Sequence, residues 1–303
     1  MHKKDLLKVY FDRHEVNSYQ AITLSVNLIF LLILFSALCH AIWSAIIKSS
    51  KNPLSLMGIT SVLEVTIFLP LTFTVPFPTI EVWYFLIATV IIHVIYRLNV
   101  IYSYKFGDLS YIYPISRGSS CLFIAIISIL FLNSYINMAG FIGILIVCVG
   151  LFLISYSKKV SFNLRGFSLA ISTSVLITAY TLVDGVGVRL SENGFSYIYW
   201  LFTLNGIPLL IIGLISKDGL RKRETYTIKS GIAAGIFATT SYAIVVWGMQ
   251  FIEIAYVSSI REISIVFATI IGMIFLFEGN AKSRILPSIL IVTGISIVYF
   301  QIL

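Results

Sequence analysis

Residues 102–115 read YSYKFGDLSYIYPI and residues 247–260 read WGMQFIEIAYVSSI, so two distant segments share one pattern. At an offset of 145 positions the aligned pairs are Phe106 with Phe251, Asp108 with Glu253, Tyr111 with Tyr256, Ile115 with Ile260, Ser119 with Ser264, Ile129 with Ile274 and Val147 with Val292. Chance matching of apolar residues explains the isoleucines and valines, but not the aromatic and acidic pairs within one window. The chain is therefore predicted to contain two related halves.

The composition excludes an ordinary water-soluble domain. Of the 303 residues, 58% are hydrophobic and 11% are charged, whereas soluble chains are about 45–50% apolar and about 25% charged. A membrane is the alternative solvent for so much apolar surface, and one spanning helix needs about 20 apolar residues. The apolar runs are continuous rather than alternating, which predicts helices and not the strands of a barrel.

Ten apolar segments are long enough to cross the hydrocarbon of a bilayer. They cover residues 24–48, 54–75, 82–104, 109–131, 138–157, 167–188, 197–215, 228–251, 255–277 and 285–302. Each half then holds five spans, and because five is odd, the second half must insert upside down relative to the first. Inverted repeats of this kind are typical of transporters.

We therefore predict an all-α integral membrane protein with ten transmembrane helices arranged as a 5+5 inverted repeat. A polar tail at 1–23 precedes the first repeat at 24–157, and a basic linker at 158–166 joins it to the second repeat at 167–303.

Three short segments resemble a known family. They are GDLSYIYPISR at 107–117, HAIW at 40–43 and AYTLVDGVGVR at 179–189. All three look like the corresponding segments of EamA-type members of the drug/metabolite transporter superfamily, and the resemblance runs from about residue 24 to the end. It implies a 5+5 inverted-repeat secondary carrier, commonly an exporter of amino acids, other metabolites or drugs.

The remaining composition argues against several other functions. The net charge of +8 comes largely from clusters between apolar runs, such as Lys158–Lys159 and Arg221–Arg223, which suit lipid headgroups rather than nucleic acid.

The three cysteines lie within apolar stretches and show neither metal nor disulfide spacing; they are Cys39, Cys121 and Cys148. Because no Walker loop, zinc motif or serine nucleophile elbow occurs, we expect no cofactor, no metal and no enzymatic activity. The first apolar run is too long for a cleavable signal.

Six charged residues fall inside the predicted spans: Glu64, Arg97, Arg117, Asp184, Arg261 and Glu262. A charge at the centre of a span costs about 2.5–3.5 kcal/mol on insertion scales, so each is predicted to face a partner or a wet cavity. Three positive charges balance three negative ones, which favours a neutral or zwitterionic cargo over a polyanion.

Arg117 and Glu262 occupy equivalent positions in the two repeats with opposite charge. A pseudo-two-fold axis would bring them to matching depth on facing helices. They are predicted either to pair across the cavity or clamp the two ends of a zwitterion, or to form a buried structural ion pair that fixes the register of the halves.

The other candidates for solute binding or coupling come from helical spacing and from aromatic residues in the spans. His93 with Arg97, and Tyr180 with Asp184, are i, i+4 pairs that share a helix face. The histidine is equally consistent with a satisfied core position. The further candidates for lining the pocket are His40, Trp43, Tyr96, Tyr113 and Trp247.

Three carboxyl groups, on Glu64, Asp184 and Glu262, are alternative proton sites, because burial raises a carboxyl pKa and a nearby cation lowers it. The sequence does not rank them.

Other residues are assigned structural roles. Tyr197, Tyr199 and Trp200 are interpreted as membrane-interface aromatics. Four glycines, Gly185, Gly187, Gly231 and Gly235, are predicted to permit close helix packing. Pro114 either breaks the fourth span and exposes carbonyls, as the resemblance implies, or is tolerated in a first turn.

Sidedness is predicted in opposite directions by two arguments. The side of the termini holds five basic residues, Lys3, Lys4, Lys8, Arg13 and Arg189, against thirteen on the other side. The positive-inside rule then favours termini that face out, whereas the resemblance implies cytoplasmic termini.

The sequence thus predicts a secondary active transporter of a small organic solute in a bacterial cytoplasmic membrane, working by alternating access. Export of an amino acid or amine-like metabolite, with proton coupling as an option, is the specific hypothesis. Membrane lipid is the expected surrounding, and the chain is expected as a monomer or homodimer. The alternatives are a flippase for a lipid-linked sugar and, in a different class, a membrane-embedded enzyme or its partner subunit.

Overall fold

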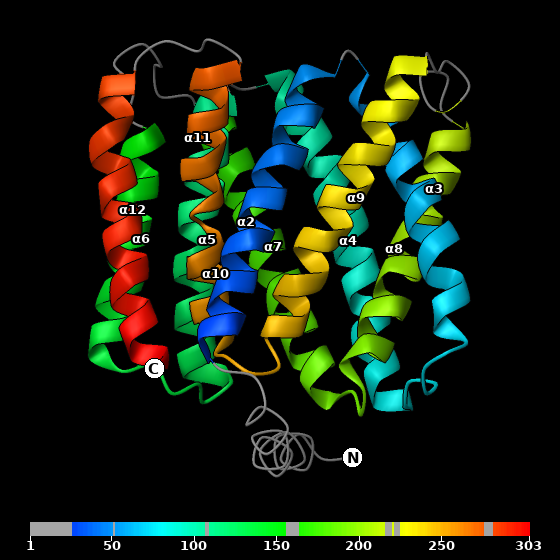
Figure 1. The fold of residues 1–303 in the computed structure, drawn as a ribbon, viewed down its shortest axis with the longest axis horizontal. Coiled ribbons are helices and arrows are strands. Elements are labelled where there is room, and N and C mark those ends of the chain that lie inside the picture. The colour runs from blue at the N-terminus through cyan, green and yellow to red at the C-terminus, as the bar shows by residue number, and fades with distance from the viewer. Residues whose placement is uncertain are drawn as a thin grey trace. The chain divides into compact units, whose positions relative to one another are not determined.

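The computed structural model describes residues 26–50, 52–106, 109–155, 164–215, 220, 225–275 and 281–303, and these residues are almost entirely helical (Figure 1). The helices are α2 (Val26–Ser49), α3 (Pro53–Thr72), α4 (Ile80–Phe106), α5 (Leu109–Phe131), α6 (Met138–Ser155), α7 (Leu164–Leu190), α8 (Gly194–Ile215), α9 (Thr225–Gly248), α10 (Ile254–Arg261), α11 (Ser264–Phe275) and α12 (Ala281–Ile302). Each of the ten predicted spans coincides with helical structure, and nine of the described helical segments are long and apolar enough to cross a membrane. The tenth, Met138–Ile154, is a shorter apolar helix.

The ninth predicted span is divided, because α10 ends at Arg261 and α11 begins at Ser264. The amides of Glu262 and Ile263 bond to carbonyls three residues earlier, Ser259 at 3.1 Å and Ile260 at 3.2 Å. Such tightened turns inside a spanning segment often mark functional positions.

The expectation of a break at Pro114 is wrong, since α5 continues through this proline. The interruption lies instead in the equivalent span of the second half.

The described chain forms two compact units that do not coincide with the two halves of the sequence. Unit 1 comprises residues up to Val90 together with Val183–Phe251, and unit 2 comprises Ile91–Leu182 together with Ile252–Leu303. Each unit therefore takes helices from both halves, and α4 and α7 contribute one end to each unit. The division into repeats at 24–157 and 167–303 stays a prediction about the sequence.

In unit 1, α3 packs against α8 and α9, and α2 packs against α9. Glycines make the approach close: a Cβ on Gly231 would lie 2.8 Å from the Ile59 side chain, and one on Gly235 would lie 3.3 Å from Leu63. The predicted packing role of these two glycines is confirmed. On α8, a Cβ on Gly206 would lie 2.7 Å from Val65.

In unit 2, α12 lies beside α6, and α5 packs against both α6 and α10 (Figure 1). The α6–α12 contact is made by backbone, because a Cβ on Gly143 would lie 2.9 Å from the carbonyl oxygen of Gly294. A Cβ on Gly150 would likewise lie 2.9 Å from the carbonyl oxygen of Pro287. Three glycines thus let the two helices approach closely along much of their length.

Candidate functional site

A buried ion pair joins α5 to the end of α10 in unit 2. The Arg117 Nε donates a hydrogen bond to Glu262 Oε2 at 3.1 Å, and Arg117 Nη2 lies 3.0 Å from Glu262 Oε1. Both side chains are almost fully buried, at 4% and 3% exposure. The two repeat-equivalent charges therefore meet, and this contact agrees equally with pairing across a cavity and with a structural ion pair.

The break between α10 and α11 positions the acidic partner. Glu262 caps α10 at φ −64° and ψ −14°, and Arg261 is the last residue of that helix. A carboxylate placed at an interruption, rather than within a continuous helix, projects from a short segment that is held by three-residue turns. Arg261 is also buried and acts electrostatically on Tyr113, so two arginines and one glutamate share this region of unit 2.

Tyrosines from α4, α5 and α7 lie near enough to Arg117 to interact with its charge. Arg117 interacts electrostatically with Tyr113, Tyr180 and Tyr96. The Tyr180 ring lies 4.3 Å from the His93 ring and 5.3 Å from the Tyr96 ring, between centroids. We name the set formed by His93, Tyr96, Tyr113, Arg117, Tyr180, Arg261 and Glu262 the ion-pair cluster.

About one turn beyond the cluster on α4, the side-chain amide of Asn99 forms hydrogen bonds to two residues of α7. The Asn99 side-chain nitrogen donates to Ser172 Oγ at 3.1 Å and to Thr173 Oγ1 at 2.9 Å. Arg97, the predicted companion of His93 on α4, is half-buried and has interaction partners of its own.

A second polar cluster lies in unit 1 around Asp184, whose side chain is fully buried. The Tyr197 hydroxyl donates to Asp184 Oδ1 at 2.8 Å, the Tyr242 hydroxyl donates to Oδ2, and Thr89 hydrogen-bonds the same carboxylate. These three residues belong to α8, α9 and α4, so four helices converge on one carboxylate. We name Thr89, Asp184, Tyr197 and Tyr242 the Asp184 cluster.

The interpretation of Tyr197 as a membrane-interface aromatic is wrong. Its side chain has no exposure at all, because Gly187 leaves room for its ring and Asp184 accepts a hydrogen bond from its hydroxyl group. Thr89 and Tyr242 were not identified from the sequence. A signal existed for each: Thr89 lies four residues before His93, and Tyr242 stands 145 positions after Arg97, at the equivalent place in the other repeat.

We expect Gly187→Ala to disturb the Asp184 cluster. A Cβ there would lie 2.5 Å from Tyr197 Cε2, and the ring is fully buried, so the variant should lose about 1–3 kcal/mol of stability. Gly248→Ala is a matched control, because its Cβ would meet the Ile33 side chain at an ordinary 3.5 Å. Thermal unfolding of both variants in detergent measures the difference. Equal stabilities would contradict the described position of Tyr197.

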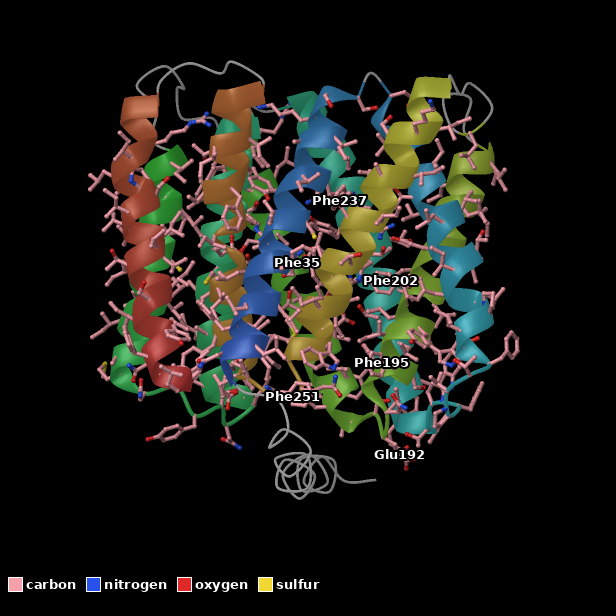
Figure 2. All side chains as sticks on the ribbon, viewed as in Figure 1. Phe35, Glu192, Phe195, Phe202, Phe237 and Phe251 are labelled. Carbon is pink, nitrogen blue, oxygen red and sulfur yellow. The ribbon has the colours of Figure 1, made fainter. Side chains whose placement is uncertain are left out.

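The other unit 1 candidates lie on different helices. Glu64 on α3 is 2% exposed, and a Cβ on Gly206 would lie 3.2 Å from the Glu64 Cβ. His40 and Trp43 on α2 face each other with ring centroids 5.4 Å apart, and Trp247 on α9 packs against Phe251 at 4.8 Å. Phe202, labelled in Figure 2, stacks on Phe68 and meets Tyr242 edge-on.

Among the described residues, no group of three metal-ligating side chains is placed to hold a metal ion.

Arg189, counted above with the loop charges, is buried in the last turn of α7. Its Nε donates to the carbonyl oxygen of Met249 at 2.5 Å, just beyond the end of α9. A cation that bonds the final carbonyls of a helix complements the helix dipole. Glu192, labelled in Figure 2, is exposed in the turn that follows. The loop charge on the side of the termini then rests on residues of the N-terminal tail, which lie outside the described residues.

Comparisons with known proteins agree with this architecture. Among solved structures, a chain described as "Crystal structure of protein" aligns over 90% of this chain and 96% of its own length, with a TM-score of 0.69 and 13% sequence identity; this likeness shows the fold alone. None of the curated proteins compared with the chain matches it. The described chain contains nine helical segments that are long and apolar enough to cross a membrane. The model of the EamA-like transporter family matches residues 164–300, from the start of α7 into the last turn of α12. This part of the chain is therefore similar to EamA-like transporters.

Proposed function

We propose that the chain is a secondary carrier that exports a zwitterionic amino acid or a closely related amine-containing metabolite by alternating access. The ion-pair cluster is the proposed binding site. The family resemblance also leads us to assign the carrier to a bacterial cytoplasmic membrane.

The observation that carries this proposal is the buried pair between Arg117 and Glu262, with its contacts of 3.1 and 3.0 Å. Removing one partner of such a pair leaves an uncompensated buried charge, at about 3–5 kcal/mol. A solute with one carboxylate and one ammonium group can replace both partners at once, with its carboxylate on Arg117 and its ammonium on Glu262. Neither protein charge is then left alone.

A solute with a single charge does not have this property. An amine would satisfy Glu262 but strand Arg117, and a carboxylic acid would do the reverse. The neighbouring tyrosines at 96, 113 and 180 offer hydroxyl groups and ring faces, which suit an ammonium group and the apolar part of a small solute.

The test is solute counterflow in proteoliposomes with three matched molecules: an amino acid, the amine made by its decarboxylation, and the carboxylic acid made by its deamination. Because stranding a charge costs several kcal/mol and each 1.4 kcal/mol is tenfold, we expect the amino acid to exchange at least about tenfold faster than either product. Equal rates for the three, or no exchange of any member of an amino-acid panel, would overturn the proposal.

A further inference from the structure

Asp184 differs from Glu262 in the kind of partner it has. Glu262 pairs with a guanidinium group, whereas the interactions of Asp184 come from three hydroxyl groups, those of Tyr197, Tyr242 and Thr89. The side chain of Asp184 is fully buried on α7.

Hydroxyl partners can serve both charge states of a carboxyl group. A hydroxyl group donates one hydrogen bond and accepts others, so all three can donate to the carboxylate. When hydronium gives a proton to one carboxylate oxygen, an O–H bond of the hydronium breaks, a new O–H bond forms on the carboxyl group and water is released. One hydroxyl then turns to accept from the new carboxylic acid, while the other two continue to donate.

Glu262 lacks this freedom. Its partner Arg117 is a permanent cation that can only donate, so a proton on Glu262 would leave a buried positive charge without compensation. Of these two carboxyl groups, only Asp184 can gain and lose a proton without leaving the charge of a hydrogen-bonded partner uncompensated.

Within the described part of the chain, the titratable groups that hydrogen-bond Asp184 are two tyrosines, which are uncharged. α8 contributes Tyr197 and α9 contributes Tyr242, whose hydroxyls ordinarily ionise only near pH 10. α4 contributes Thr89, which does not titrate. Protonation of Asp184 therefore changes the charge of this cluster from minus one to zero.

Two helices, α4 and α7, each contribute residues to both the Asp184 cluster and the ion-pair cluster. On α7, Tyr180 precedes Asp184 by four residues, and on α4, His93 follows Thr89 by four residues. Four residues make about one turn, or about 6 Å of helix. Tyr180 and His93 in turn face each other with ring centroids 4.3 Å apart.

From these observations we propose that Asp184 is the proton-binding site that couples the carrier to the transmembrane proton gradient. The role as a coupling site rests on the proposed transport function, whereas proton binding itself does not. Thr89 lies on the same helix as His93 of the proposed solute site, and Asp184 lies on the same helix as Tyr180.

Proton binding is tested without any solute, by infrared difference spectra of the purified chain as the pH is lowered. We expect a band of a protonated carboxyl group that is lost in Asp184→Asn and kept in the double variant Arg117→Gln/Glu262→Gln. Tyr242→Phe removes a donor to the charged form, so the midpoint of the band should move to higher pH by about one unit. Tyr84→Phe is the matched control, since Tyr84 is 67% exposed on α4. A band that persists in Asp184→Asn, or a midpoint that is equal in Tyr242→Phe and Tyr84→Phe, would overturn proton binding at Asp184.

Coupling is tested in proteoliposomes by comparing accumulation driven by a pH gradient with counterflow at equal pH on both sides. In Asp184→Asn we expect gradient-driven accumulation to fall at least tenfold relative to counterflow, while Asp184→Glu keeps part of it. Gradient-driven accumulation by Asp184→Asn that equals the wild type would overturn the coupling role. If no amino acid is moved even by the wild-type chain, the proposed function fails, and the infrared result still decides whether Asp184 binds a proton.

Discussion

Arg117→Gln and Glu262→Gln are each expected to abolish transport and to destabilise the folded chain by about 3–5 kcal/mol. The reason is the burial of both partners, at 4% and 3% exposure. Either change leaves one charge of the pair with no counter-charge at 3 Å and with little access to water. Counterflow in proteoliposomes measures the first effect, and thermal unfolding in detergent measures the second.

The double variant Arg117→Gln/Glu262→Gln separates solute binding from structural support. It contains no buried charge at these positions, and two amides can hydrogen-bond each other, so most of the lost stability should return. Replacing a buried ion pair by neutral groups is often close to neutral for stability. If the pair binds a zwitterion, transport stays lost in this stable variant.

A purely structural pair predicts the opposite result. Transport would then recover together with stability in the double variant, and the proposed binding role of Arg117 and Glu262 would be contradicted. Arg284→Gln is a suitable control for loss of a positive charge, because Arg284 is only half-buried near the start of α12. It should change neither transport nor stability by more than about 0.5 kcal/mol.

The sequence predicted the ten helical spans, although not the division of the ninth, and it offered contact between Arg117 and Glu262 as one alternative. Continuous apolar runs predict helices directly, and the helix α5 begins and ends at the two residues expected for its span. The register of the repeat then placed Arg117 and Glu262 as counterparts, because an internal symmetry turns sequence positions into spatial ones. Their opposite charges make contact between them physically reasonable on the sequence alone.

The partners of Asp184 were harder to predict because they come from three different helices. Whether Tyr197 faces lipid or the interior depends on which helix packs against it, and hydropathy gives the same value in both cases. The break after Arg261 also has no local signal, since neither glycine nor proline occurs between residues 255 and 269. The compact units combine helices from both halves, so contacts within a unit link residues that are far apart in the sequence.

A close backbone contact between α6 and α12 in unit 2 gives the second large prediction. A Cβ on Gly294 of α12 would lie 2.5 Å from the carbonyl oxygen of Gly143 and 2.9 Å from the amide nitrogen of Val147, both on α6. Both of these neighbours are backbone atoms in a helix, which cannot move aside as a flexible side chain can. Gly294→Val must therefore push α12 away from α6.

Separation of the two helices would be costly because packing, rather than the hydrophobic effect, holds helices together in lipid. Ile291 and Val298 on α12 and Val147 on α6 are completely buried, and all three would lose contacts at once. We expect Gly294→Val to lose at least about 3 kcal/mol and to yield little monodisperse protein in detergent, with Gly294→Ala intermediate. The control is again Gly248→Ala, where the new Cβ meets only a side chain at 3.5 Å. A Gly294→Ala variant as stable as Gly248→Ala would show that the α6 and α12 backbones do not approach as closely as described.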